Sequence, residues 1–572
     1  MKKGRLAFAV LLLFVTANLF AATYTIRSYS FNIKGKTTDT ALSEFVGAPG
    51  ATFGTLEEME AHVADKRQQL YNKRIFHEVG FTYTLEDMGG DVFMADVVIY
   101  IDDARTFIIL PFPKYDSNYG FELKVKAMDS NFLGTFATME ANVYLSQENN
   151  TFKEGDLGWD LTISSMKIKQ ATLSLTHEGR LYFADWASSY ANLKAAISDI
   201  NLGGVNLNGS VSFEVGPKGG AATDGWSLRS VNTSLGAAYD FEKIGLSNSL
   251  SFNMVPDTEE MFRLVPDNIT DTIGIKFKNE SLSSPTLSTT LTYYFGSKVF
   301  ATNTVFTNKL DNLYGITTTI SYATSQTGFD DGLDSFKPGF GISRGFALFS
   351  KVSFTPSVTI YFPYYIAPAL LDPYLVTTLP FSYGSINWLE NNFRKGFVFA
   401  LTASDTYSFF EETHSSSMTG SATVHYPVTS WFNPSARLDF KWANTLLNIN
   451  YEDAYSEKLR GIRNDNEEIN RYRKFGMILN LDMLFNFIRI SDFCSTYAVP
   501  FMDIFVGSND DDGLDTMVTI GGEGIIVLDD YPSFPIRGSL GFNAKDLMNW
   551  MRGEIGLTDV EFELFIGLHY FY

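Results

Sequence analysis

The sequence contains one cysteine, few charged residues and, beyond residue 22, no long apolar run. The single thiol, Cys494, excludes an intramolecular disulfide framework and any cysteine-rich zinc or iron–sulfur site. Charged residues make up 19% of the chain and the net charge is -21, so a basic surface for a phosphate backbone is lacking and we expect no nucleic-acid partner. A chain without an apolar run of about 20 residues can cross a membrane only as a β-barrel.

The first 22 residues have the three parts of a secretory signal peptide. Lys2, Lys3 and Arg5 precede an uncharged apolar run, which ends at Ala21-Ala22. We therefore expect residues 1–22 to be a signal peptide and the protein to be exported. The cleavage site stays open, because Leu19 lies where a small residue is usual.

Residues 23–103 predict a small α+β domain. Thr55-Leu56-Glu57-Glu58 forms a capping box for a helix that reaches about Tyr71, and Glu86 to Gly90 form a turn. The other expected elements are a strand over Tyr24–Ile33, a short helix within Thr37–Val46 and strands over Phe76–Leu85 and Val92–Tyr100. This β-α-α-β-β order resembles a polypeptide-transport-associated (POTRA) domain, which implies a periplasmic location.

Residues 104–572 are expected to form an antiparallel β-barrel, because segments of alternating apolar and polar residues recur here between Asn, Asp, Gly and Ser. Alternation alone also fits a soluble sandwich, but the signal peptide and the 15% aromatic content favour a membrane barrel with aromatic girdles. The last strand ends the chain on an aromatic residue, which resembles the recognition signal of bacterial outer-membrane barrels. Its shared apolar face comprises Phe562, Leu564, Ile566, Leu568, Tyr570 and Tyr572.

Three segments resemble the last third of the BamA/TamA family of outer-membrane barrels, a family that inserts or translocates polypeptides. They are Leu459-Arg460-Gly461-Ile462-Arg463, Phe475–Phe487 and Val499–Gly507. In the family, an Arg-Gly-aromatic motif lies on a loop folded into the barrel lumen, and a Phe-x-Asp-x-Gly motif lies on a later strand. Ile462 replaces the aromatic residue, and Phe505 takes the glycine position after Phe501 and Asp503. Near the N-terminal edge of the barrel, Pro113-x-Tyr115-Asp116 through Gly120 and Asp129-x-Asn131-Phe132-Leu133-Gly134 resemble the first barrel hairpin.

The resemblance implies that Arg460 meets Asp482 and Asp503 inside the lumen. A buried guanidinium without a carboxylate partner would be costly, so this pairing is physically reasonable. The alternative is that Arg460 and the charged residues up to Arg473 form a solvated extracellular loop. The family also implies about 16 strands, although raw segmentation gives about twenty, and a seam between the last strand and a first strand at about Tyr119–Met128.

A competing motif lies at Gly341-Ile342-Ser343-Arg344-Gly345-Phe346, which contains a second Arg-Gly-Phe and the G-x-S-x-G spacing of a hydrolase elbow. The residues that follow alternate like a strand, whereas an elbow needs a helix. We therefore expect no enzyme and no catalytic residue. The histidines lack metal-ligand spacing, and the acidic run from Asp510 to Asp515 is interpreted as a turn, so we expect no metal site and no cofactor.

These observations predict an outer-membrane barrel that inserts, assembles or translocates client polypeptides, using a POTRA sheet edge and a lateral barrel seam. The expected partners are outer-membrane lipids and unfolded or exported client polypeptides, with periplasmic chaperones or assembly lipoproteins as further candidates. A porin-like passive channel, or another divergent outer-membrane barrel, is the alternative. A soluble β-sandwich adhesin is the third.

Overall fold

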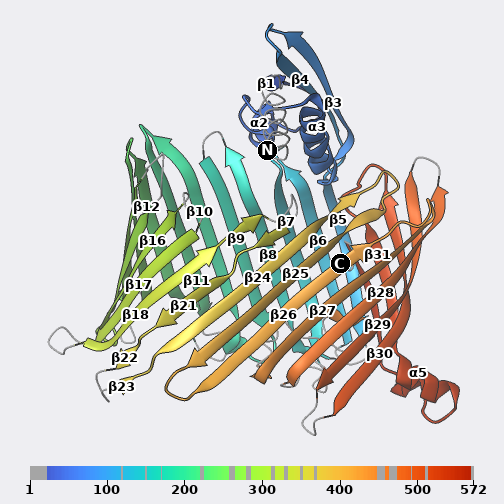
Figure 1. The fold of residues 1–572 in the computed structure, drawn as a ribbon. Helices are drawn as coiled ribbons and strands as arrows, with labels where there is room; N and C mark the ends of the chain where they lie inside the picture. The colour runs from blue at the N-terminus through green and yellow to red at the C-terminus, as the bar shows by residue number, and fades with distance from the viewer. Residues whose placement is uncertain are drawn as a thin grey trace, which may run out of the picture.

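A computed structural model describes two parts of the chain, a small N-terminal domain and a large β-barrel (Figure 1). The description covers residues 22–568 except 117–119, 149–150, 169–170, 219–224, 257–263, 278–284, 311–315, 328–332, 348–351, 366–369, 448–457, 463–472, 491–492 and 509–512. The expected signal peptide therefore lies outside the described residues. Among those residues, no helix is both long enough and apolar enough to cross a membrane.

The N-terminal domain is a mixed four-stranded sheet with two helices. Its elements are β1 (Thr23–Lys34), α2 (Asp39–Val46), β2 (Thr52–Phe53), α3 (Leu56–Tyr71), β3 (Phe76–Asp87) and β4 (Val92–Asp103), and the sheet order is β2-β1-β4-β3. β1 pairs parallel to β4, while β3 and β4 form an antiparallel hairpin. The Thr55 hydroxyl accepts a hydrogen bond from the Glu58 N–H and so begins α3, as the capping-box spacing predicts. Leu42, Met59 and Leu70 of the two helices are fully buried in the core between helices and sheet.

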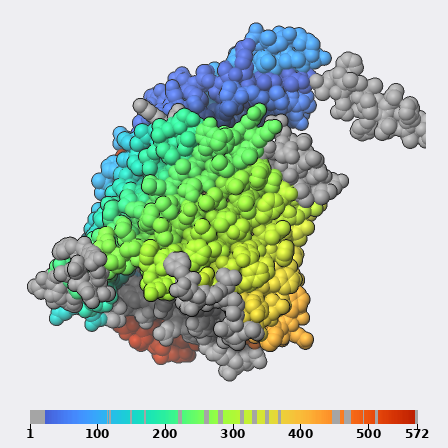
Figure 2. Space-filling model, turned by 90° about the vertical axis from the view of Figure 1, so that its left-hand side faces the viewer, coloured from blue at the N-terminus to red at the C-terminus, as the bar shows by residue number. Residues whose placement is uncertain are grey.

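The second part is an antiparallel barrel of 24 strands, which overturns the expectation of about 16 strands. The middle of the chain explains the difference. Its alternating segments would have been extra loop hairpins in a smaller barrel, but they are wall strands between β8 and β26. The face of the wall that the middle of the chain forms is coloured green in Figure 2. Alternation identifies a wall strand but carries no information about how many strands close the barrel. The strand number implied by the family resemblance, about 16, was therefore wrong.

The barrel strands follow one another around the wall in chain order, and short strands β19 to β23 together complete the wall between β18 and β24. They are β5 (Phe107–Asp116), β6 (Gly120–Phe132), β7 (Ala137–Glu148), β8 (Thr151–Ile168), β9 (Ala171–Tyr182), β10 (Tyr190–Leu202), β11 (Val205–Pro217), β12 (Trp226–Asp240), β13 (Ile244–Pro256), β14 (Leu264–Phe277), β15 (Thr286–Tyr294), β16 (Val299–Leu310), β17 (Ile316–Thr327), β18 (Leu333–Arg344), β19 (Phe346–Ala347), β20 (Val352–Phe354), β21 (Ser357–Tyr361), β22 (Tyr364–Tyr365), β23 (Leu370–Leu371), β24 (Tyr374–Trp388), β25 (Arg394–Ser408), β26 (Thr413–His425), β27 (Phe432–Leu447), β28 (Arg473–Ile490), β29 (Cys494–Ser508), β30 (Leu514–Leu528), β31 (Ile536–Asn543) and β32 (Phe562–Leu568). The short helix α5 (Ala544–Met551) joins β31 to β32 at the end of the barrel away from the N-terminal domain (Figure 1).

The first wall strand is β5, not the predicted strand at about Tyr119–Met128, which falls within the second strand β6. β5 is unusual because two prolines, Pro111 and Pro113, interrupt its alternation. Proline cannot donate a ladder hydrogen bond and is therefore typical of strands at an edge. The two prolines explain why alternation alone does not predict β5, although its end, Pro113-x-Tyr115-Asp116, resembles the first barrel hairpin.

Side chains alternate between an apolar outer face and a polar inner face. In β28, Met483 and Phe487 are 51% and 71% exposed on the outside, whereas Asn480 and Asp482 are 1% and 8% exposed on the inside. Paired residues of neighbouring strands lie on the same face, so the inner and outer faces of β28 continue onto β27 and β29. A polar interior and an apolar exterior are the reverse of a soluble sandwich and are typical of a membrane barrel.

Candidate functional site

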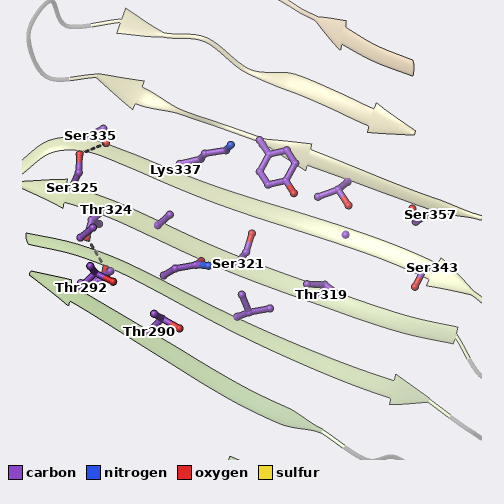
Figure 3. Close-up of a pocket in the computed structure, with 18 of the residues that line it drawn as sticks. Thr290, Thr292, Thr319, Ser321, Thr324, Ser325, Ser335, Lys337, Ser343 and Ser357 are labelled. Atoms are coloured by element: carbon purple, nitrogen blue, oxygen red, sulfur yellow. Dashed lines mark hydrogen bonds between the residues drawn. The ribbon is translucent and has the colours of Figure 1, made fainter. Parts of the chain in front are cut away.

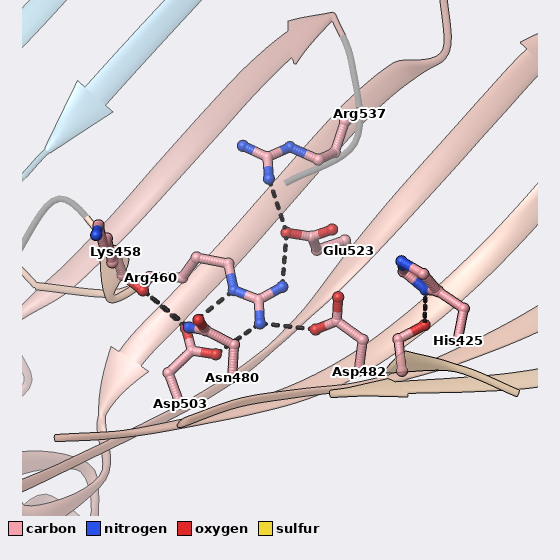
Figure 4. Close-up of polar contacts among 9 residues, drawn as sticks. His425, Lys458, Arg460, Asn480, Asp482, Asp503, Glu523 and Arg537 are labelled. Atoms are coloured by element: carbon pink, nitrogen blue, oxygen red, sulfur yellow. Dashed lines mark hydrogen bonds and ion pairs between the residues drawn. The ribbon is translucent and has the colours of Figure 1, made fainter. Parts of the chain in front are cut away.

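The lumen loop, residues 458–462, lies on the inner wall and places Arg460 among three carboxylates (Figure 4). Its Nη2 lies 2.7 Å from Asp482 Oδ1 and 2.6 Å from Asp503 Oδ1. Its Nη1 lies 3.1 Å from Glu523 Oε1. The Arg460 N–H and Nε also donate to Asp503 Oδ2, so one aspartate fixes both the backbone and the side chain. The structure thus brings together Arg460, Asp482 and Asp503, the three residues predicted to meet.

Two members of this cluster were not predicted, Glu523 of β30 and Arg537 of β31. Arg537 Nη1 lies 3.2 Å from Glu523 Oε1, so this carboxylate joins two arginines. Arg537 also lies over the Phe565 ring, 4.6 Å from its centre. Alternation within Met517–Leu528 predicts that Glu523 faces inward. The sequence pattern does not show which strands contact the loop, because that depends on how the barrel closes.

Phe501 and Gly461 set the close fit of the loop against the wall. The Arg460 guanidinium lies 3.7 Å from the centre of the Phe501 ring, so this aromatic residue of the predicted motif stabilises the cation by a cation–π interaction. Gly461 has φ +90°, and a Cβ there would come within 2.5 Å of the Gly541 carbonyl carbon. Only glycine combines this conformation with this approach. The Gly461 N–H also donates to Glu563 Oε2 at 3.2 Å, which ties the loop to the last strand, β32.

Ile462 packs beside the arginine in an apolar cluster with Leu459, Ile478 and Phe505. Ile462 is 1% exposed, and both Ile478 and Phe505 are fully buried. The two departures from the motifs that the sequence resembles therefore lie in one cluster. Ile462 stands where the resembled motif has an aromatic residue, and Phe505 stands where it has glycine.

The barrel closes through a seam between β32 and β5. Among the described residues these strands pair at three positions, Glu563 with Asp116, Leu564 with Tyr115 and Phe565 with Lys114. On its other side, β5 pairs with β6 along its whole length, from Phe107 to Asp116. Within the described residues, the seam thus includes Glu563, the residue that the lumen loop contacts.

The turn between β6 and β7 anchors the N-terminal domain to the barrel. The Asp129 carboxylate accepts hydrogen bonds from Lys36 Nζ at 2.8 and 2.9 Å, and Asn131 Nδ2 donates to Thr37 Oγ1 at 2.8 Å. Gly134 has φ +71°, and a Cβ there would lie 1.9 Å from the Lys36 carbonyl oxygen. The segment from Asp129 to Gly134, which resembles part of the first barrel hairpin, also docks the N-terminal domain.

Apolar and aromatic contacts strengthen this anchor. Phe136, which follows the same turn, packs against the core of the N-terminal domain at Phe45 and Phe76, with both ring pairs edge to face. Lys73 lies 4.9 Å from the centre of the Phe136 ring, and burial lowers the pKa of its amine. The domain and the barrel thus share part of one core.

A second contact lies elsewhere on the rim, at the turns after β24 and β30. Arg74 lies 4.0 Å from the Trp388 ring centre, and its guanidinium donates to Pro532 O at 2.7 Å and Asn392 Oδ1 at 2.8 Å. Because the turns at Asp129–Phe136 and at Trp388 belong to different parts of the wall, the domain is fixed at two places on the rim.

The other predicted residues are partly outside the description. Arg463, Tyr570 and Tyr572 lie outside the described residues, and Leu568 ends β32 with only its backbone described. Phe562, Leu564 and Ile566 share the outer face of β32, since Glu563 between them contacts the lumen loop. Ser343 lies within β18 and is followed by β19, so the helix that a hydrolase elbow needs does not follow this serine. Within the described chain, no group of three metal-ligating side chains could hold an ion.

Neither a protein-family model nor a curated protein sequence matches the chain. Solved structures that match include BamA from Haemophilus ducreyi lacking POTRA domains 1-3, at 12% identity over 96% of this chain and 85% of that chain, with a TM-score of 0.26. CdiB from Acinetobacter baumannii matches at 9% identity over 88% and 73%, with a TM-score of 0.26. BauA, the ferric preacinetobactin receptor of the same organism, matches at 8% identity over 83% and 81%, with a TM-score of 0.38. At these values the matches carry no argument about family or function.

Proposed function

We propose that this protein is an outer-membrane barrel of the BamA/TamA type that inserts, assembles or translocates client polypeptides. The observation that carries the proposal is the seam between the last strand, β32, and the first, β5, together with the lumen loop that contacts β32 through Glu563. A strand edge that opens in lipid leaves backbone groups without partners, so it can template a client strand. The role requires no cofactor and no covalent chemistry.

The location follows from the outer face of the wall. Exposed apolar residues surround it, including Ile109 on β5 at 57% exposure and Leu235 on β12 at 69%. The Phe485 ring stacks on the rings of Trp431 and Phe432. Trp431 follows Ser430, which accepts a hydrogen bond from Asn391 in the turn that contacts the N-terminal domain. An apolar band with aromatics at its border matches a lipid bilayer and its interface. The expected export signal and C-terminal strand then favour the bacterial outer membrane, with the N-terminal domain in the periplasm.

The N-terminal domain would deliver clients as a POTRA domain. Its element order fits the POTRA resemblance, with the two-residue strand β2 as an addition. β3 is an edge of the sheet, and its twelve residues present backbone groups to which an extended client can add as a further strand. Clients would pass from this edge to the seam. The expected partners are those of a barrel-assembly or secretion system: lipids, unfolded or exported polypeptides, and periplasmic chaperones or assembly lipoproteins.

A disulfide across the seam tests the proposal. Leu564 faces Tyr115 across the seam and faces Leu540 across the neighbouring β31–β32 pair. These three side chains lie on the outer face at 43%, 39% and 40% exposure, so cysteines there are equally accessible to an oxidant. The test variant carries Leu564→Cys with Tyr115→Cys, and the matched control carries Leu564→Cys with Leu540→Cys. Both carry Cys494→Ser to remove the native thiol.

We expect the seam disulfide to abolish client handling and a reductant to restore it, while the control disulfide leaves activity unchanged. The measurement is insertion or export of clients in a strain depleted of the native protein, with and without reductant. Full activity of the oxidised seam variant would show that the seam does not open for clients. Equal loss in both variants would show that wall stiffness, not the seam, matters.

A further inference from the structure

We propose that the part of the lumen opposite the lumen loop is an aqueous path for small uncharged hydrophilic solutes. This activity is separate from client handling at the seam. It rests on the inner face of β15 to β18 and β21, called here the hydroxyl wall, whose lining residues surround a hollow of about 700 Å³ (Figure 3).

The register shows that the hydroxyl wall lies inside the barrel. Asp482, which contacts the lumen loop, pairs with Ser435 of β27, and the facing positions can be followed strand by strand from there. Through β26, β25 and β24 this face reaches Ser357 of β21 and then Ser343 of β18. Ser321 of β17 faces the lumen with these residues, because it pairs with Gly339 on the same face of β18. The alternate residues Ile320 and Phe340 are 48% and 50% exposed on the outside.

Small uncharged side chains line the hollow. Serine and threonine dominate the lining, with one charged residue, Lys337. The Lys337 amine lies 4.5 Å from the centre of the Tyr361 ring and 5.1 Å from that of Tyr374, so this cation lies against aromatic rings of the wall. Gly339 leaves room for the Tyr361 ring, because a Cβ there would come within 2.7 Å of it. The wall therefore has short side chains and little charge.

The charged part of the lumen lies on other strands. Arg460 contacts acids of β28, β29 and β30, and Gly461 contacts β32, so the loop packs on that side of the wall. Neighbouring β27 carries a further ion pair, Arg437 with Asp439. A barrel of 24 strands is wider than those in which side chains alone fill the interior. Among the described residues, the lumen loop packs on that side of the wall, and the hydroxyl wall lines a hollow on other strands.

The chemistry of the hydroxyl wall selects the solute. Hydroxyl groups both donate and accept hydrogen bonds, so they can replace the hydration of a sugar or similar solute at little cost. Fixed charges would instead attract ions of the opposite sign and slow them by binding. A wall that is rich in hydroxyls and poor in charge therefore suits neutral polar solutes of sugar size.

Liposome swelling tests this proposal with the full chain reconstituted. Proteoliposomes loaded with dextran are diluted into an isotonic neutral pentose, and the swelling rate is compared with that of protein-free liposomes. Ser321→Trp and Thr319→Trp place bulk on the hydroxyl wall, whereas Thr318→Trp places the same bulk on the outer face of the same strand. We expect wild type to swell, the two inward variants to slow swelling several-fold, and Thr318→Trp to match wild type.

Absence of swelling above the protein-free rate would overturn the proposal. So would equal swelling of Ser321→Trp and Thr318→Trp, provided that both variants keep the heat-modifiable mobility of a folded barrel. Client handling is measured in the same variants. Loss of swelling with client handling intact supports a separate path and leaves the seam mechanism standing, whereas failure of the seam disulfide test leaves the swelling result unaffected.

Discussion

Ile462 of the lumen loop and Phe505 of β29 belong to one buried apolar cluster, which also holds Leu459 and Ile478. Ile462 stands where the motif that the sequence resembles has an aromatic residue, and Phe505 stands where that motif has glycine. The cluster joins Leu459 and Ile462 of the loop to Ile478 and Phe505 of the wall, next to Arg460.

We predict that these two residues are energetically coupled. Ile462→Phe alone adds volume to a full cluster and should cost about 1–3 kcal/mol. Phe505→Gly alone leaves a cavity and should cost about 3–5 kcal/mol, the range of Phe→Ala truncations. The double variant should lose clearly less than the sum, measured as resistance to SDS against temperature. Additive losses would mean that the two side chains do not share one space.

The ion cluster gives a second prediction. Arg460→Ala leaves Asp482, Asp503 and Glu523 without their shared cation, which should cost about 3–5 kcal/mol if the site stays dry. Arg460→Lys keeps the charge, but an ammonium group cannot bind several carboxylates as the planar guanidinium does. The SDS resistance of Arg460→Lys should therefore lie between those of wild type and Arg460→Ala. Arg344→Ala is the control, since Arg344 lies over the Phe346 ring, away from the lumen loop. Unchanged SDS resistance of Arg460→Ala, or a greater loss for Arg344→Ala, would contradict the importance of the cluster.

Docking of the N-terminal domain gives a third prediction. Gly134→Ala should loosen the domain, because the new Cβ would collide with the Lys36 carbonyl oxygen. Gly203→Ala is a matched control: Gly203 also has positive φ, +62°, at a turn between strands, but its Cβ position has no neighbour within 4 Å. Hydrogen exchange around Lys36 to Thr38 should rise in Gly134→Ala and stay at the wild-type level in Gly203→Ala. Equal exchange in the two variants would argue against docking through this turn.

The membrane location gives a fourth prediction. A closed ladder of backbone hydrogen bonds resists SDS until heated, so unboiled and boiled samples should migrate differently. The protein should also require detergent for extraction and stay with membranes in carbonate. Identical migration together with release by carbonate would remove the membrane barrel and favour the soluble sandwich.

The sequence predicted those parts of the site that depend on local pattern. Alternation places Asp482 on the inner face, and the motif around Arg460 indicates which arginine the loop carries inside. Glu523 and Glu563 could not be found in this way, because they meet the loop only when β30 and β32 are curved around it. The strand number failed for a related reason. Each strand pattern describes one strand, whereas the number of strands depends on where the seam closes.

The N-terminal domain was likewise predicted element by element, but its placement was not. Capping at Thr55 and the hairpin β3–β4 are local features, and the structure contains them. The docking of Phe136 and Arg74 joins residues distant in sequence, and neither residue is distinguished by its neighbours in the chain. Their role becomes visible only when the rim and the domain are seen together.

The connection from β4 to β5 has a mechanical consequence. β4 ends at Asp103 and β5, the seam strand, begins at Phe107, so three residues join the sheet of the N-terminal domain to the seam. So short a tether has little slack to absorb a pull. A load on the β3–β4 hairpin would therefore be transmitted almost directly to β5, while the two anchors at Gly134 and Arg74 act as fixed supports. A rotation of the N-terminal domain about these two contacts on the rim would then move β5 at the seam.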